Sequence, residues 1–436
     1  MTQLRPFLET SIQLARRGAV EARSAAHAWR AGMLTLESPA RTAAILRAMD
    51  RLGQIGAAGE IPALRYPQRT GLIDELGSLT FAQLRDRSRA LASALHARGV
   101  REGDTVGILC RNHRGFIDIT FAAGRLGTRM LYLNTDFAGP QLKDVCEREG
   151  VSLLVHDAEY ENLVGTIEPR LGRVLGWVDD SPSGTDTIEE LIARHAGEVP
   201  PDPAQPADVV LLTSGTTGTP KGAPRHQGRS LHPPGALLSK VPYRAGESTF
   251  VAAPMFHGLG FTQMVLCMIL GSTTIVQRRF APDAVLDAIA RERPTALVVV
   301  PVMLSRIVSL MEAEPGRWDT SSLRIVFLSG SQLEAELVRR AQRTIGHKLY
   351  NFYGTTEVAW ATFATPEDLR AAPGTAGRPP FGTVVRLVDD QGRTVSGAGK
   401  VGRIFVGNGF QFDGYTGGGG KEMIDGLMST GDVGHF

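Results

Sequence analysis

Leu211-Leu-Thr-Ser-Gly-Thr-Thr-Gly-Thr-Pro-Lys-Gly-Ala223 is the stretch of sequence that decides the fold. It begins inside an apolar run, Val209–Leu212, which predicts a buried strand. Small hydroxylated residues and glycines follow, and the series ends on Lys221. Hydroxyl groups, backbone N–H groups at glycines and an ammonium group are donors that proteins offer to phosphate. The stretch therefore predicts a strand that leads into a loop wrapping the phosphates of a nucleotide.

Two other interpretations of this loop are weaker. A Walker A loop has the pattern Gly-x4-Gly-Lys-Ser/Thr, but counting from Gly215 this chain has Pro220 in place of the second glycine. Lys221 is followed by Gly222, which has no hydroxyl group for a metal ion. A plain surface loop rich in Ser, Thr and Gly is the other alternative. The apolar strand directly before the loop favours a phosphate site over a plain loop.

Three motifs, in this order along the chain, carry a family resemblance. Thr213-Ser-Gly-Thr-Thr-Gly-Thr-Pro-Lys-Gly222 resembles the phosphate loop of the adenylate-forming superfamily, which includes acyl- and aryl-CoA synthetases, luciferases and the adenylation domains of peptide synthetases. Tyr353-Gly-Thr-Thr-Glu357 resembles the Tyr-Gly-x-Thr-Glu motif of that family, and Thr430-Gly-Asp432 resembles its Thr-Gly-Asp motif. The resemblance covers the chain from about Leu64 to Phe436.

The fold class follows from the order of strand and helix patterns together with this resemblance. At 436 residues the chain is too long for one small core, which predicts two or three subdomains. Alternating strand and helix patterns predict mostly parallel sheets flanked by helices. The resemblance implies an α/β, multi-subdomain adenylate-forming fold. We expect an N-terminal helical extension over residues 1–60, an α/β adenylation core over 61–379 and a smaller β-rich subdomain over 380–436 that ends at the hinge.

Local patterns place some elements individually. Thr80 and Gln83 have the spacing of a capping box, which predicts a helix that starts there and ends at Gly99. The β-branched run Leu297–Val300 is typical of a central parallel strand. The segment 223–239 contains prolines and histidines and has no clear periodicity.

Composition limits the class of partner and the compartment. The net charge of +2 does not favour nucleic acid, and three widely spaced cysteines favour free thiols in a reducing compartment. The chain has no secretory signal pattern, so we expect a cytoplasmic protein. Residues 1–30 form an amphipathic, arginine-bearing pattern. They predict a helix docked on the body, with a peripheral membrane contact or a fatty-substrate contact left open, as is a homodimer.

The superfamily reaction joins a carboxylate to ATP, which gives an acyl-adenylate and pyrophosphate, and the acyl group then passes to a thiol. Two anions meet in the first step, so the site must neutralise charge. The resemblance implies that Lys221 holds the phosphates, that Thr217 contacts phosphate or metal, and that Glu357 binds Mg²⁺. Glu357 could otherwise be a neighbour of a helix N-cap. ATP, Mg²⁺ and CoA as co-substrate are therefore expected.

The nucleotide side of the site is expected at strand ends, where open α/β sheets bind ligands. By resemblance Tyr353 packs against adenine and Asp432 accepts hydrogen bonds from the ribose, although Asp432 could be a plain turn residue. Gly330-Ser331 departs from the Gly-Ala or Gly-Gly that family members often have. The other residues expected to bind nucleotide belong to the same motifs: Thr213, Ser214, Gly215, Thr216, Gly218, Thr219, Gly330, Ser331, Gln332, Gly354, Thr355 and Thr356.

The acid side of the site is expected in Met255-Phe-His-Gly-Leu-Gly-Phe261. His257 resembles the histidine beside the reacting carboxylate in fatty acyl-CoA synthetases, and Phe261 stands where long-chain members often have an aromatic guard. Either residue could instead be ordinary core packing, as could Trp360. The expected substrate-contacting residues are Phe256, Gly258, Phe261 and Trp360.

These observations predict a fatty acyl-CoA synthetase, with fatty acid, ATP and CoA as its partners. A fatty acyl-AMP ligase, an aryl or short-chain acid CoA ligase, and a non-catalytic module that binds acyl-adenylate or lipid are the alternatives. The chain stops at Phe436, directly after Thr-Gly-Asp. We expect the family's mobile C-terminal subdomain to be absent, so that this N-terminal part binds ATP and acyl-AMP but turns over poorly.

Overall fold

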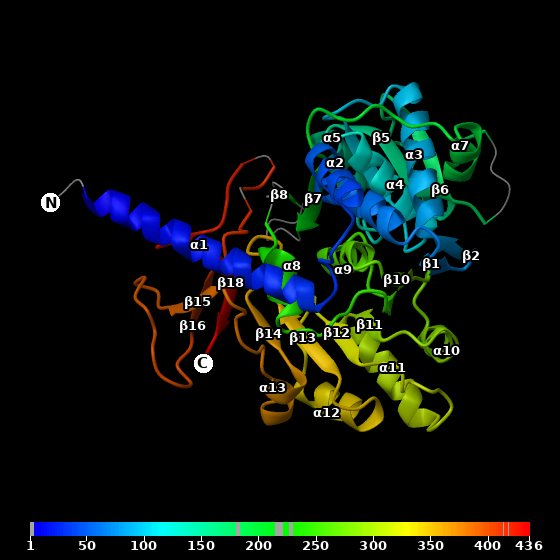
Figure 1. The fold of residues 1–436 in the computed structure, drawn as a ribbon. Coiled ribbons are helices and arrows are strands. Elements are labelled where there is room, and N and C mark those ends of the chain that lie inside the picture. Colours follow the sequence, from blue (N-terminus) through cyan, green and yellow to red (C-terminus); the bar gives the residue numbers. More distant parts are fainter. Residues whose placement is uncertain (1–3, 180–183, 214–220, 226–229, 413, 417) are drawn as a thin grey trace.

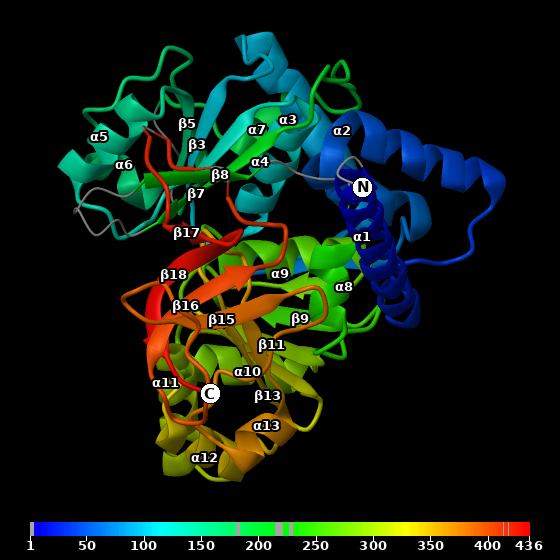
Figure 2. The ribbon, with the colours of Figure 1, turned by 90° about the vertical axis from the view of Figure 1, so that its left-hand side faces the viewer.

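Three β-sheets with flanking helices make up the computed structural model of this chain. The structure describes residues 4–179, 184–213, 221–225, 230–412, 414–416 and 418–436, and the side chains of residues 4–14, 213, 224 and 225 lie outside this description. Within these residues the strands form one sheet of six, one of eight and one of four. Figure 2 shows the two larger sheets one above the other, with the small sheet in front.

The six-stranded sheet, in the order β6-β5-β3-β4-β7-β8, holds the strand that precedes the phosphate loop. Its strands are parallel except for β8, which pairs antiparallel with β7 at the edge. The strands are β3 (Thr105–Leu109), β4 (Arg129–Tyr132), β5 (Val151–Asp157), β6 (Arg173–Trp177), β7 (Asp208–Thr213) and β8 (Lys221–Arg225). The helices of this part are α3 (Phe81–Arg98), α4 (Arg114–Arg125), α5 (Gly139–Arg148), α6 (Glu161–Val164) and α7 (Ile188–Arg194), with a 3-10 turn at Ala158–Tyr160.

The eight-stranded sheet has the order β14-β13-β12-β11-β9-β10-β1-β2, and only its two edge strands run antiparallel to their neighbours. Its strands are β1 (Thr70–Asp74), β2 (Gly77–Thr80), β9 (Ser248–Val251), β10 (Thr273–Ile275), β11 (Ala296–Val299), β12 (Ile325–Leu328), β13 (Leu349–Tyr353) and β14 (Thr362–Ala364). The helices that accompany it are α8 (His232–Leu238), α9 (Gly258–Ile269), α10 (Pro282–Glu292), α11 (Pro301–Ala313), α12 (Ala335–Thr344) and α13 (Pro366–Ala371).

The four-stranded sheet is antiparallel, in the order β15-β16-β18-β17. Its strands are β15 (Val384–Val388), β16 (Gly402–Gly407), β17 (Met423–Ile424) and β18 (Leu427–Gly434). Two long helices precede everything else, α1 (Leu4–Arg30) and α2 (Pro39–Arg65). Figure 1 shows α1 lying across α8, with its N-terminal end reaching away from the body.

The sequence patterns explain several of these elements. Thr80 caps α3 through a complete capping box with Gln83, and Gly99 ends the helix in the left-handed region at φ 105°, so the predicted helix is confirmed. β11 pairs in parallel with a strand on each side, and all four of its residues are buried, as expected from the run Leu297–Val300. The three cysteines are free and buried, which agrees with the expectation of free thiols.

The predicted fold class is confirmed: an α/β architecture with largely parallel sheets, flanking helices and a small β-rich C-terminal part. Some details differ from the expectation. The apolar run Thr262–Leu270 is typical of a helix, but α9 already starts at Gly258, so that His257 stands at its N-cap. The segment without clear periodicity, 223–239, contains the end of β8 and the short helix α8.

Candidate active site

Lys221 starts strand β8, opposite Thr213 at the end of β7. The residues between these two, 214–220, include the expected phosphate ligands Ser214, Gly215, Thr216, Thr217, Gly218 and Thr219, and they lie outside the described residues. Lys221 is followed by a strand and not by a helix, as the rejection of a Walker A loop requires. The hairpin therefore places the ammonium group of Lys221 at the edge of the six-stranded sheet, next to the expected phosphate loop.

Tyr415 stands between Lys221 and Glu357. The Tyr415 hydroxyl donates a 2.5 Å hydrogen bond to Oε1 of Glu357, and the Lys221 ammonium lies 5.3 Å from the centre of the Tyr415 ring. Glu357 is buried, with 6% of its surface exposed. Burial, and then the hydrogen bond to Glu357, raise the pKa of Tyr415, so its hydroxyl keeps the proton that it donates. The structure thus brings the expected phosphate cation and the expected metal carboxylate to one tyrosine.

Thr416, the residue after Tyr415, binds its loop to β8 through hydrogen bonds. Its amide N–H donates to the Gly222 carbonyl at 2.9 Å, its hydroxyl accepts from the Gly222 N–H at 3.1 Å, and the hydroxyl donates to Oε1 of Glu149 at 2.6 Å. A Cβ on Gly222 would come within 2.7 Å of the Thr416 hydroxyl oxygen and 2.8 Å of a Val210 methyl carbon. A glycine after Lys221 is therefore needed for this close approach.

Tyr353 and Asp432 lie in contact, although they belong to different sheets. The Tyr353 hydroxyl donates to Oδ2 of Asp432 at 2.8 Å, and its oxygen lies 3.2 Å from the hydroxyl of Thr430. Tyr353 is the last residue of β13, and Asp432 lies in β18, where its carboxylate is exposed. The two residues expected at the adenine and the ribose are thus neighbours.

The turn after β13 is tightly built. Thr355 accepts a hydrogen bond from the Val358 N–H at 3.3 Å, and a Cβ on Gly354 would meet the Ala359 carbonyl oxygen at 2.2 Å. Ala359 has a positive φ of 64°, which is strained for a residue with a side chain. Thr356 is half-buried in this turn. Such strain between Glu357 and Trp360 is typical of a turn held in place by its surroundings.

The expected adenine wall, Gly330, Ser331 and Gln332, follows strand β12 and is exposed. Gly330 has a φ of 100°, which only glycine adopts easily. β12 is the neighbour of β13 in the eight-stranded sheet. Residues 330–332 and Tyr353 therefore lie at the carboxyl ends of two adjacent parallel strands.

His257 lies beside the strand that precedes the phosphate loop. A Cβ on its neighbour Gly258 would lie 3.5 Å from a methyl carbon of Leu211 in β7. The side chain of His257 is exposed, with the Phe256 ring centre 4.5 Å from its own. Desolvation lowers the pKa of His257, although Asp136 opposes the shift, which favours a neutral imidazole at neutral pH.

Phe261 lies in the core, one turn further along α9. It is buried, with its ring centre 4.9 Å from that of Tyr132, and Tyr132 stacks on Phe116 at 5.3 Å. All three rings belong to the largest hydrophobic cluster among the described residues. Phe261 is therefore in contact with packed interior aromatics.

Trp360 belongs to a cluster of rings near the small sheet. Its ring centre lies 5.4 Å from that of His232, edge-on, and 5.2 Å from that of Phe410. Its indole N–H donates to the hydroxyl of Thr383 at 2.8 Å, and its carbonyl accepts from the side chain of Asn408 at 2.8 Å. Trp360 is thus held from several sides.

Sequence reasoning did not identify Tyr415, Thr416, Glu149 or His232 as residues near the site. The two residues of the Tyr415–Glu357 pair are 58 positions apart, and no periodic pattern links them. Tyr415 stands beside a glycine-rich stretch, which resembles an ordinary surface turn when only the sequence is considered. Their proximity depends on how the small sheet packs against the other two.

Two features elsewhere do not form sites. Cys110, His113 and Asp157 are close enough to bind a metal ion, but the His113 ring accepts from the Gly115 N–H at 3.0 Å and donates to Asp157 at 2.8 Å. With both ring nitrogens engaged, this is a structural network.

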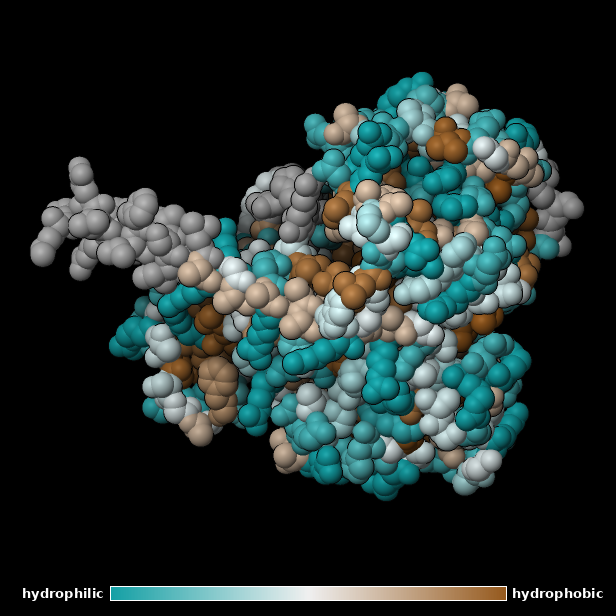
Figure 3. Space-filling view, viewed as in Figure 1, coloured by the Kyte–Doolittle hydropathy of each residue, from teal (hydrophilic) through white to brown (hydrophobic). Residues whose placement is uncertain are grey.

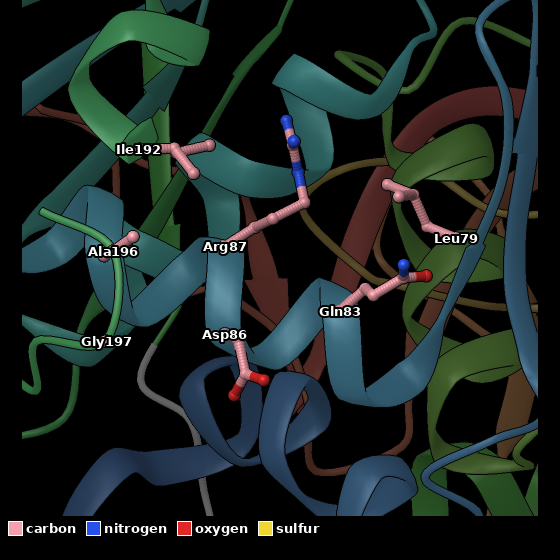
Figure 4. A pocket seen from close by; sticks show the side chains of 8 residues that line it. Leu79, Gln83, Asp86, Arg87, Ile192, Ala196 and Gly197 are labelled. Carbon is pink, nitrogen blue, oxygen red and sulfur yellow. The ribbon is translucent and has the colours of Figure 1, made fainter. Parts of the chain in front are cut away.

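The second feature is an open depression of about 280 Å³ between α3 and α7 (Figure 4). Two charged residues line it: Arg87 is paired with Asp118 and Glu189, at 2.7 and 2.5 Å, and Asp86 is paired with Arg85 at 2.8 Å. Each charged side chain that lines the depression is thus already paired with a neighbouring residue.

Comparison with known proteins now identifies the family. Residues 60–416 match the AMP-binding enzyme family. A feruloyl-CoA synthase of Amycolatopsis sp is 35% identical, over 82% of this chain and 71% of the relative. An indoleacetate–CoA ligase of Aromatoleum aromaticum is 32% identical, over 86% and 72% of the two chains. The chain therefore belongs to the AMP-binding enzyme family, as an adenylate-forming acid–CoA ligase.

A solved structure agrees. The o-succinylbenzoate CoA synthetase of Bacillus subtilis, in complex with its acyl-adenylate, superposes with a TM-score of 0.74 at 26% identity, over 87% of this chain and 75% of that one. No described helix is both long and apolar enough to cross a bilayer. The face in Figure 3 is mostly hydrophilic, with hydrophobic residues in small separate groups.

Proposed function

We propose that this chain activates an aromatic carboxylic acid with ATP and transfers the acyl group to CoA. The observation that carries this proposal is that Lys221 and Glu357 both contact Tyr415. The adenylation step needs a cation and a metal-binding carboxylate close to the same polyphosphate, and this arrangement brings the two together. Tyr353 and Asp432, which contact each other, would bind the adenine and ribose from the other side.

Mg²⁺ fits the donors that the site offers. Glu357 presents a buried carboxylate whose described hydrogen-bond partner is a neutral hydroxyl, and carboxylate oxygen is a ligand that Mg²⁺ prefers. In this proposal Glu357 holds the ion together with Thr217. A bound Mg²⁺ would neutralise phosphate charge, while Lys221 binds the phosphates and the neutral His257 ring lies beside the reacting carboxylate.

The preference for an aromatic acid rests on Phe261. Its ring is buried against Tyr132, which itself stacks on Phe116, so a long acyl chain passing Phe261 would have to displace packed aromatic rings. Moving such rings costs packing energy that a flat, short acid does not require. The names of two relatives, which act on ferulate and indoleacetate, point in the same direction.

A fatty acid is the second candidate, because an aromatic residue four positions after His257 is the pattern of long-chain family members. The two candidates differ in the size of the acid that the site accepts. They share the nucleotide side, so ATP and AMP alone do not distinguish them.

Thermal unfolding of the chain with non-hydrolysable acyl-adenylate analogues separates the candidates. The series runs from benzoyl and feruloyl to dodecanoyl and palmitoyl, with AMP and ATP–Mg²⁺ as references. A ligand at a hundred times its dissociation constant adds about 2.7 kcal/mol to the free energy of unfolding. We expect the aromatic analogues to give the largest shifts. A shift that grows with aliphatic chain length would establish the fatty-acid candidate instead, and no shift with any nucleotide would refute both.

A further inference from the structure

Helix α1 lies outside the segment that matches the family, which begins at residue 60, yet it packs against α8 and Phe381. Figure 1 shows the C-terminal half of α1 crossing α8. The side chains that make the contacts lie between Val20 and Ala31. This half of α1 is therefore part of the body of the protein.

The contact between α1 and α8 is close and polar at its edge. Glu21 accepts a hydrogen bond from the hydroxyl of Ser230 and another, at 3.0 Å, from the N–H of Leu231. A Cβ on Gly235 of α8 would come within 2.5 Å of the Cβ of Ser24, which is buried. The glycine lets the two helices approach to backbone distance, so a larger residue at either contact would push them apart.

A second contact joins α1 to Phe381, in the segment before β15. The His27 ring stacks on Phe381 with ring centres 5.6 Å apart and planes 16° apart. The Arg23 guanidinium carbon lies 4.6 Å from the centre of the same ring. Stacking and cation–π contacts of this kind hold α1 against the segment that carries Phe381.

Both contacts lead to Trp360. His232, the first residue of α8, donates from Nε2 to the Phe381 carbonyl at 2.9 Å and meets Trp360 edge-on. A Cβ on Gly382, which has a φ of 74°, would come within 2.6 Å of His232 Nε2. The hydroxyl of Thr383, two residues after Phe381, accepts the indole N–H of Trp360. Trp360 thus contacts α8 and the segment 381–383, and α1 packs against both.

We propose that α1 is a positioning element for the acid side of the site, with Glu21, Arg23 and His27 fixing Trp360 through His232 and Phe381. Trp360 follows Glu357 by three residues, after the strained residue Ala359, so a shift of Trp360 would change the surface that the proposed function assigns to the acid. The inference rests on the proposed function, in which Trp360 contacts the acid. It predicts that α1 affects binding of the acyl group and leaves binding of the nucleotide unchanged.

The test compares two ligands on the full chain by isothermal titration: AMP, and a non-hydrolysable feruloyl-adenylate analogue. His27→Ala and Glu21→Ala remove contacts to Phe381 and α8. His27→Phe keeps a stacked ring, and Arg17→Ala changes an exposed residue of the same helix. We expect the alanine variants at His27 and Glu21 to bind the analogue about threefold to tenfold more weakly, with AMP affinity within about twofold. His27→Phe and Arg17→Ala should match the unaltered chain.

The outcomes separate the inference from the proposed function. An unaltered chain that binds both ligands, with His27→Ala and Glu21→Ala either indistinguishable from it or equally weakened for AMP and the analogue, would overturn the inference alone. An unaltered chain that binds neither ligand would overturn the proposed function and the inference with it. Thermal unfolding of each variant without ligand shows whether α1 remains docked, because a merely structural role lowers stability without changing the ratio of the two affinities.

Discussion

Tyr415 contacts two of the expected active-site residues, Glu357 and Lys221. It lies on a loop of the small four-stranded sheet, donates a hydrogen bond to Glu357 after β13, and presents its ring to Lys221 of β8. In the absence of nucleotide it supplies the hydrogen-bond donor that a buried carboxylate needs. Bound Mg²⁺ would compete for the same carboxylate, so Glu357 would exchange the Tyr415 hydroxyl for the metal ion when the nucleotide binds.

Replacing Tyr415 by phenylalanine should therefore affect stability in a ligand-dependent way. Tyr415→Phe keeps a ring near Lys221 but leaves one oxygen of Glu357 without its donor. We expect the free energy of unfolding to fall by roughly 1.5–3 kcal/mol. ATP–Mg²⁺ should restore part of this loss, because the metal would replace the missing hydroxyl.

Urea unfolding with and without ATP–Mg²⁺ measures both effects. A double-mutant cycle with Glu357→Gln provides the control, because the two changes should be clearly non-additive if the residues interact as described. Additive changes, or an equal loss with and without ATP–Mg²⁺, would contradict this assignment.

Gly222 tests whether the close approach behind Lys221 matters. Gly222→Ala places a methyl group against the Thr416 hydroxyl and a Val210 methyl, and overpacking of this kind costs roughly 1–3 kcal/mol. Affinity for ATP should fall as well, because Lys221 is the adjacent residue. Gly420→Ala is the matched control, since a Cβ there meets nothing within 4 Å. Calorimetric unfolding and ATP titration of both variants check the prediction, and equal behaviour of the two would count against it.

At the scale of elements, the sequence predicted what depends on local chemistry. The capping box at Thr80, the buried strand β11 and the strand before the phosphate loop all follow from residue pattern and spacing. The short helix α8 could not be predicted, because its prolines and histidines have no helical periodicity and its position depends on α1 and Phe381. Tyr415 and Thr416 were missed for a related reason: their partners lie on other sheets, and nothing in the local sequence indicates them.

The hydrogen bonds by which Thr416 holds its loop against β8 and Glu149 should weaken in acid. Burial alone would raise the pKa of Glu149, but hydrogen bonds from Thr416, Arg129 and Arg148 outweigh it and leave the pKa lowered. A carboxyl group whose pKa is lower in the folded chain stabilises it above the unfolded value of about 4.3, and this stabilisation is lost as the pH falls through the folded pKa.

Thr416→Val removes one of these hydrogen bonds and should cost about 1–2 kcal/mol at pH 7. The difference from the unaltered chain should shrink as the pH is lowered from 7 through the folded pKa of Glu149, because the carboxyl group then loses the charge that this hydrogen bond stabilises. Denaturant unfolding across this pH range gives the measurement. Thr416→Ser, which keeps the hydroxyl, is the control, and a difference that does not vary with pH would exclude a role for the Glu149 charge.

At the scale of the whole molecule, each of the three sheets contributes to the candidate site. Lys221 comes from the six-stranded sheet, Tyr353 and Glu357 from the end of the eight-stranded sheet, and Asp432 and Tyr415 from the small sheet and its loop. α1 joins α8 to the segment that enters the small sheet. A ligand bound at this junction would contact all three parts at once, so its effects should extend beyond any single element.

Hydrogen exchange measures this directly. With ATP–Mg²⁺ bound, the amides of β8, of the turn 353–359 and of β18 should all exchange more slowly, because a ligand that contacts three sheets suppresses the openings that separate them. α10 lies on the far side of the molecule from β8 and the small sheet (Figure 1). It should exchange as it does in the free chain, which makes it the internal control. Protection confined to one of the three segments would mean that the nucleotide does not bridge the sheets. Protection of all three together with unchanged exchange in α10 would locate the nucleotide between the three sheets.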